Sequence, residues 1–98
     1  MNIQAMMKQA QQLQKEMANA KKEIDETIFE KKNSFLSIKM NGKREVMSVK
    51  LDIQNIENDD IEIIEDLIQV TISDLNKLID VETEKKLGKF TKGIPGLF

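Results

Sequence analysis

The sequence has no cysteine and no histidine among its 98 residues. The missing cysteine excludes disulfides and thiolate chemistry, and the missing histidine removes the commonest general base and a frequent metal ligand. A catalytic site would need serine, lysine and carboxylate side chains, and the chain has neither a nucleophile elbow nor a phosphate-cradling glycine loop. We therefore expect a protein that is not an enzyme, uses no cofactor and acts on no small-molecule substrate.

Long apolar runs are also absent. No run approaches the ~20 apolar residues that span a bilayer, and the N-terminus lacks the basic-then-apolar pattern of a signal peptide. These absences predict a cytoplasmic protein without a membrane partner.

Aromatic residues are scarce, with four phenylalanines and no tryptophan or tyrosine. The core must therefore be built from aliphatic side chains. A domain of this size buries only about two-thirds of the surface that its unfolded chain exposes, so its stability alone is marginal. We expect an oligomer, because binding between copies stabilises the folded state.

The first 26 residues carry a regular heptad. Apolar residues recur at alternating spacings of three and four, which is typical of an amphipathic helix that seeks a partner helix. No glycine or proline interrupts the segment, so we predict a helix over residues 2–26. The seam consists of Ile3, Met6, Ala10, Leu13, Met17, Ala20 and Ile24.

The opposite face of this helix is basic and rich in amides. Lys8, Lys15 and Lys22 are spaced seven apart, and Gln12 is one of several amide residues beside them. Such a face suits an anionic partner, but outer positions are polar in any coiled coil. From the residues alone we favour a merely solvated face.

Residues 27–53 change to the alternation of strands. Residues 27–29 are β-branched or aromatic, and residues 36–40 and 47–53 alternate between apolar and polar. Asn41-Gly42 is the strongest short hairpin signal, because both residue types tolerate positive φ. We predict a three-stranded antiparallel meander with one buried and one wet face.

A second helix is predicted over residues 59–87. Asn58 or Asp59 can cap its start, and Gly88 is suited to the position just after its end. Residues 89–98 contain two glycines and a proline, and we expect a flexible tail there. The fold class is α+β: one α-β-β-β-α domain over residues 1–98 with two long helices.

Charge is distributed unevenly along the chain, although the net charge is only −2. Residues 57–66 include six acids and no base, and residues 85–92 include four lysines and no acid. The acids suit a helix start, and the glycine that an EF-hand loop requires is missing, so we expect no metal. Lys85, Lys86 and Lys89 suit a helix end, and they are also a second candidate surface for an anion.

Five short motifs, in this order and spacing, resemble those of the YbaB/EbfC family of nucleoid-associated proteins across nearly the whole chain. They are Met7-Lys8-Gln9-Ala10-Gln11 with Leu13-Gln14, Met40-Asn41-Gly42 with Val49-Lys50-Leu51-Asp52, Glu65-Asp66-Leu67-Ile68, Ser73-Asp74-Leu75-Asn76-Lys77, and Ile94-Pro95-Gly96-Leu97-Phe98. The chain departs from the family at residues 32–35, where glycines are usual, and at residues 69–72, where alanines are common.

The resemblance implies a bacterial protein of the cytoplasm and nucleoid that forms a tweezer-like homodimer. It implies binding to double-stranded DNA with little sequence specificity, altered DNA conformation, and roles in nucleoid organisation and gene regulation. It brings no enzyme activity and no cofactor. The family has no distinct motif for DNA contact, so the candidate residues come from the charge pattern: Lys8, Gln12, Lys15, Lys22, Lys85, Lys86 and Lys89.

An alternative function is a protein-interaction module similar to a prefoldin-like chaperone, which also joins helices through hairpins. The short helices and the third strand argue against it, whereas the acidic isoelectric point of about 5.2 favours it.

Overall fold

The computed structural model describes residues 2–91. It contains the helix α1 (Ile3–Glu26), the strands β1 (Ile28–Lys32), β2 (Leu36–Asn41) and β3 (Val46–Leu51), and the long helix α2 (Ile61–Thr91). Two single-turn 3-10 helices, η1 (Ile53–Asn55) and η2 (Asn58–Asp60), connect β3 to α2. This order confirms the predicted α-β-β-β-α fold. Residues 92–98 of the expected tail lie outside the described residues.

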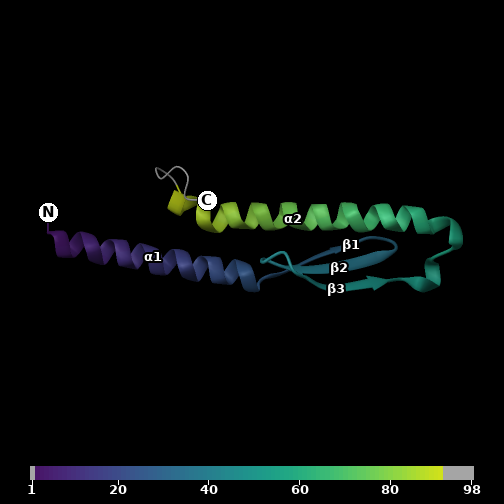
Figure 1. The fold of residues 1–98 in the computed structure, drawn as a ribbon, viewed down its shortest axis with the longest axis horizontal. Coiled ribbons are helices and arrows are strands. Elements are labelled where there is room, and N and C mark those ends of the chain that lie inside the picture. Colours follow the sequence, from purple (N-terminus) through teal and green to yellow (C-terminus); the bar gives the residue numbers. More distant parts are fainter. Residues whose placement is uncertain (1, 92–98) are drawn as a thin grey trace.

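The molecule is elongated, with extents of 70 × 21 × 14 Å. The strands form an antiparallel sheet in the order β1-β2-β3, and α2 lies along one face of this sheet (Figure 1). Beyond the hairpin end of the sheet, α1 continues along the same direction beside the last part of α2, and its N-terminal half projects past α2 (Figure 1). The fold therefore has a packed end and a projecting arm.

The main core lies between β2 and α2. Leu36, Ile38 and Met40 alternate along β2 with residues that face the other way, as a period of two requires. They pack against buried residues of α2 that recur at helical spacing, namely Ile64, Leu75 and Ile79. The core is aliphatic, as the composition predicts.

A smaller cluster joins the two helices. Ile24 packs with Leu87 and Phe90, and Met17 and Ala20 lie against this group. The predicted end of the second helix at Leu87 is wrong, because α2 continues through Gly88 to Thr91. A glycine inside a helix costs about 0.5–1 kcal/mol, whereas burial of a phenylalanine contributes about 1.5–3 kcal/mol. The burial of Phe90 therefore offsets the cost of Gly88.

The hairpin between β2 and β3 forms where Asn41-Gly42 indicates it, but the residue with positive φ is Arg44 rather than Asn41 or Gly42. The amide of Arg44 donates to the carbonyl of Asn41 (3.0 Å), and the amide of Asn41 donates to the carbonyl of Glu45 (3.0 Å). Arg44 has a φ of 68°. This is a three-residue loop that ends in a left-handed residue. The Asn41 side chain holds it, because Oδ1 accepts hydrogen bonds from the amides of Lys43 and Glu45.

Gly42 is required for a close approach rather than for a positive φ. A Cβ atom at this position would overlap the carbonyl of Ile24 and would lie 2.9 Å from the amide nitrogen of Asp25. The obstructing atoms belong to the backbone at the end of α1, which cannot turn aside as a side chain does. Gly42 thus lets the hairpin and α1 meet.

The turn between β1 and β2 forms without the glycines that are usual in the family. Asn33 Oδ1 accepts hydrogen bonds from the amides of Phe35 and Leu36, both at 3.0 Å. Its Nδ2 donates to the buried hydroxyl of Thr71 on α2 (3.2 Å). The two places where the sequence departs from the family pattern are therefore joined by one hydrogen bond.

The third strand is less buried than its alternation predicts. Ile53 lies in η1, and a bulge interrupts the pairing opposite Lys39 and Met40. Val46, Val49 and Leu51 are 45–48% exposed. The reason is that α2 contacts β1 and β2 but, within residues 2–91, not β3. The apolar side of β3 thus lies uncovered.

The start of α2 also differs slightly from the expected cap at Asn58 or Asp59. The amide of Asp60 donates to the carbonyl of Glu57 (2.9 Å), and Asp60 Oδ2 accepts from the amide of Glu57 (2.9 Å), so the cap precedes η2. Asp59 follows within η2, and α2 begins at Ile61. None of the helices described is long and apolar enough to cross a membrane.

Candidate nucleic-acid interface

The projecting half of α1 is the most accessible helical surface of the molecule. Asn2 begins the helix by accepting a hydrogen bond from the amide of Gln4 at its Oδ1 (3.0 Å). Every residue from 3 to 16 is exposed. An uninterrupted run of good helix formers favours the helix here, although none of these side chains is buried against another element.

Lys8, Lys15 and Lys22 form a stripe along α1, hereafter the arm stripe. All three are exposed, and no ion pair within residues 2–91 involves them. The seam of α1 packs on α2 through Met17 and Ala20. Residues opposite a heptad seam point away from the partner helix, so the arm stripe faces away from α2 with its charges unneutralised.

Gln12 lies near the arm stripe but is partly occupied. Its Nε2 donates to Glu16 Oε1 one turn further on, at 3.3 Å. The pair is exposed, and the second N–H of this amide has no partner within residues 2–91.

The second candidate group lies at the end of α2. Lys85, Lys86 and Lys89 line a cleft of about 500 Å³ between α2 and the middle of α1. The Nζ of Lys86 is 3.1 Å from Glu23 Oε2 and 3.9 Å from Glu82 Oε1, so this lysine joins the two helices. Lys89 Nζ lies 5.0 Å from the centre of the Phe90 ring.

The two lysine groups do not form one surface. Lys85, Lys86 and Lys89 line the cleft between the helices, whereas the arm stripe points away from that cleft. Lys86 is neutralised by two carboxylates, and Lys85 and Lys89 are exposed. Of the predicted residues, the arm stripe offers the larger set of accessible cations that lack an acidic partner.

Arg44, to which the sequence assigns no role, is a structural tether. Its Nη1 donates to Asn76 Oδ1 (2.6 Å) and to the Asn76 carbonyl (3.2 Å), and its Nη2 forms an ion pair with Asp80. These contacts fix the hairpin to α2. They join residues 32 and 36 positions apart, so no local sequence signal indicates them.

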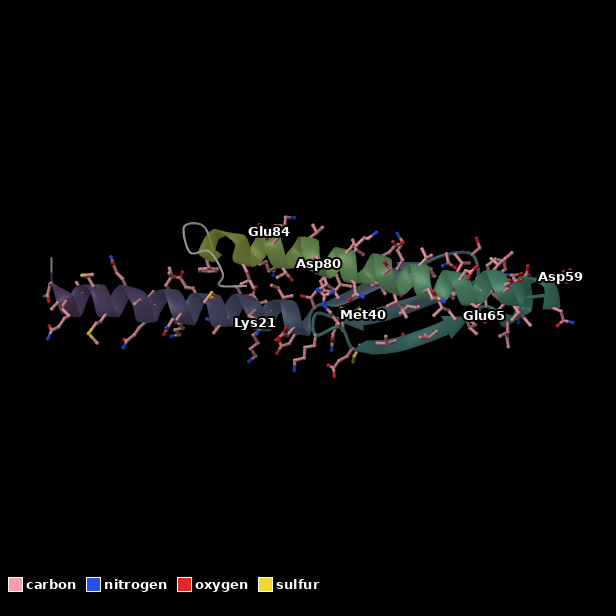
Figure 2. All side chains as sticks on the ribbon, turned by 45° about the horizontal axis from the view of Figure 1, so that its top comes forward. Lys21, Met40, Asp59, Glu65, Asp80 and Glu84 are labelled. Carbon is pink, nitrogen blue, oxygen red and sulfur yellow. The ribbon has the colours of Figure 1, made fainter. Side chains whose placement is uncertain are left out.

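The acidic run of residues 57–66 lies at the end of the molecule opposite the projecting half of α1 (Figure 1). Figure 2 shows Asp59 and Glu65 at the end opposite the projecting half of α1, while Lys21 lies on α1 itself. Within the part of the chain that the structure describes, no three acidic residues are arranged to hold a metal ion. Lys8 and Lys15 are therefore distant from this acidic run.

The whole chain matches known proteins. The model of the YbaB/EbfC DNA-binding family matches residues 1–94. The chain belongs to this family. A nucleoid-associated protein of Lactococcus lactis subsp. cremoris (strain MG1363) is 39% identical over 97 residues, which cover 97% of this chain and 98% of that protein.

Relatives in other bacteria agree. A nucleoid-associated protein of Ligilactobacillus salivarius is 33% identical, covering 99% of this chain and 95% of its own length. One of Chloroflexus aurantiacus is 34% identical, with both chains fully covered. The family resemblance carried by the five motifs is thereby confirmed.

Proposed function

We propose that this protein binds double-stranded DNA as a homodimer, with little sequence specificity, through phosphate contacts from the arm stripe. The observation that carries the proposal is a projecting helix whose outer lysines are exposed and unpaired, in a chain of a DNA-binding family. The names of its bacterial relatives support a place in the nucleoid, and hence in the cytoplasm. Roles in nucleoid organisation and gene regulation follow from that place.

Lysines of this kind bind DNA by neutralising phosphates and releasing counterions. Each phosphate contact steepens the log–log dependence of affinity on salt by about 0.9. Three lysines per protomer give about six phosphate contacts in a dimer, so we expect affinity to fall steeply as the salt concentration rises. The arm stripe has no arginine to read guanine edges, so we expect sequence-tolerant binding.

The homodimer is supported by apolar surface that nothing within residues 2–91 covers. β3 is an edge strand, and Val46, Val49 and Leu51 expose nearly half of their side chains beside it. An exposed apolar edge strand is a template for pairing with another chain. We place the interface at β3, because this position leaves both arms free to hold one duplex and constrain its path.

The interface is tested by light scattering after size-exclusion chromatography. Val49→Lys should convert the dimer to a monomer, because it puts a charge into the apolar patch. Val81→Lys is the matched control. Val81 is 64% exposed and lies on α2, which does not contact β3 within residues 2–91. A dimer that survives Val49→Lys and dissociates with Val81→Lys would move the interface to α2.

DNA binding is tested by gel-shift titration on random-sequence duplex at low salt and at about 150 mM, where the Debye length is ~8 Å. Lys8→Gln/Lys15→Gln/Lys22→Gln should bind the duplex much more weakly than the wild type, and the remaining binding should depend less steeply on salt. Lys31→Gln/Lys43→Gln/Lys77→Gln removes the same charge from exposed lysines elsewhere, and it should bind nearly as the wild type does.

Other outcomes separate the alternatives. Binding as tight as that of the wild type after loss of the arm stripe would assign the main DNA contact to another basic surface, such as Lys85 and Lys89. No binding by the wild type at either salt would overturn the proposal and favour the prefoldin-like interaction module, whose exposed apolar seam on α1 includes Ile3 and Leu13. Suppression of client aggregation would then identify that module.

A further inference from the structure

The open face of the sheet carries a group of charges that neither the sequence motifs nor the family assigns. On β2, Leu36, Ile38 and Met40 face α2, so Ser37 and Lys39 face the opposite side. The strand register places one row across the sheet as Lys32, Ser37 and Lys50, and the next row as Glu30, Lys39 and Ser48.

This register brings three lysines around one hydroxyl. Lys32 and Lys50 flank Ser37 directly, and such cross-strand neighbours have Cβ atoms about 4.5–5.5 Å apart. Lys39 lies two residues along β2, about 7 Å from Ser37. The lysines are exposed, and none has an ion pair within residues 2–91. They are named the sheet triad: Lys32, Lys39 and Lys50.

The surface between them is hollowed rather than flat. A shallow pocket of about 270 Å³ is lined by the sheet triad together with Ser37 and Ser48. Two carboxylates border it and are already engaged. Glu30 Oε2 accepts a hydrogen bond from Ser37 Oγ (3.1 Å), and Asp52 Oδ2 accepts one from Asn55 Nδ2 (2.6 Å). The three ammonium groups outnumber the two acids.

We propose that the sheet triad is a second phosphate-binding surface, which holds a DNA segment other than the one bound by the arm stripe. The partner chemistry follows from the three clustered lysines and the hydroxyls of Ser37 and Ser48 that line the same pocket, because ammonium and hydroxyl groups suit phosphate oxygens. The surface lies on the packed half of an elongated molecule, whereas Lys8 lies on the projecting half. The inference rests on the proposed function for the nature of its partner.

Two surfaces on one dimer make the protein a bridge between DNA segments. The test uses a duplex fixed to beads and a second, fluorescent duplex free in solution, with full-length protein as the only link. Wild type should retain the fluorescent duplex in a salt-sensitive manner. Lys32→Gln/Lys39→Gln/Lys50→Gln should still bind a single duplex in a gel shift but should lower retention about tenfold or more, as expected for three lost phosphate contacts.

Glu30→Gln makes the same face of the sheet more positive, whereas the triple lysine variant makes it less positive. It removes a carboxylate beside Lys39 while keeping an acceptor for Ser37, so retention of the second duplex should rise. The matched control is Lys31→Gln/Lys43→Gln/Lys77→Gln, which should retain it as the wild type does. Because Glu30→Gln leaves all lysines in place, it remains informative even if the triple variant folds poorly.

The outcomes distinguish this inference from the proposed function. Retention unchanged by both sheet variants, in a protein that needs the arm stripe for gel-shift binding, would overturn the second surface and leave the first intact. A wild type that binds one duplex but never retains a second would do the same. Gel-shift binding that is lost with the sheet triad and unaffected by the arm variant would instead overturn the proposed function, with the sheet as the sole DNA surface.

Discussion

The two long helices have similar sequence patterns and opposite environments. In α2, Leu75 and Ile79 are 0% and 1% exposed, because the sheet lies against their face of the helix. In α1, Ile3 and Leu13 occupy an equally regular seam and are 73% and 50% exposed. A regular apolar seam therefore does not by itself show that a helix is covered within its own chain.

Their lysines differ in the same way. Lys86 of α2 meets Glu23 and Glu82 where the helices touch, so its charge is neutralised internally. Lys8 and Lys15 of α1 are exposed and have no ion pair within residues 2–91. The lysine at the contact between the helices is thus neutralised within the protein, whereas the lysines of the projecting half are not.

The largest expected effect separates the two seams. Leu75→Ala opens a cavity in the main core and should lower the free energy of unfolding by about 2–5 kcal/mol. Leu13→Ala on the projecting arm is the control and should change it by less than about 0.5 kcal/mol. Denaturant unfolding at one protein concentration measures both. Equal losses would show that the arm seam is buried in the folded assembly.

The next effect concerns the junction between the regions. Gly42→Ala should cost about 1–3 kcal/mol, as for overpacking, because its Cβ overlaps the backbone at Ile24. It should also loosen α1, which amide hydrogen exchange near residues 20–26 would detect. An unchanged midpoint together with unchanged exchange would contradict the close approach.

Substitution of a second glycine, Gly88, should raise the free energy of unfolding rather than lower it. Gly88→Ala places a Cβ 3.1 Å from Glu84 Oε1, which is the mobile end of a side chain. Because the position is helical, alanine should stabilise the protein by about 0.4–1 kcal/mol through a less flexible unfolded chain. Thermal unfolding measures the shift. A lower melting temperature would indicate that the Glu84 side chain cannot move aside for the added Cβ.

The smallest effect concerns the hairpin tether. Asp80→Asn removes the charge that pairs with Arg44, and exposed pairs contribute about 0.2–1 kcal/mol. The loss should shrink at ~1 M salt, where the Debye length falls to ~3 Å. Asp74→Asn on the same helix is the control, because Asp74 has no ion pair within residues 2–91. A loss that is independent of salt would assign the tether to hydrogen bonding alone.

Sequence patterns predict most of the elements because period and capping are local properties. The heptad over residues 3–24 and the alternation over residues 36–40 place α1 and β2 almost to the residue. The errors arise where distant contacts override local preference. Gly88 is a good helix terminator, but the packing of Phe90 on Ile24 continues the helix beyond it.

The candidate site was predictable in part for the same reason. The spacing of Lys8, Lys15 and Lys22 puts them on one helical face, and the structure leaves that face exposed. The partial neutralisation of Lys86 was not predictable, because Glu23 lies 63 residues away. The sheet triad has a signal in strand alternation, but only the register shows that Lys32 and Lys50 flank Ser37.

By itself the sequence determined the order of elements, the aliphatic character of the core, the separation of acids from lysines, and the family, since these depend on local periodicity, composition and motif spacing. Only the tertiary structure decided which apolar faces are covered, which charges are neutralised, and why Gly42 must be a glycine. The physical reason is that burial and pairing depend on where α2 lies over the sheet, and that position results from many weak contacts between residues far apart in the chain.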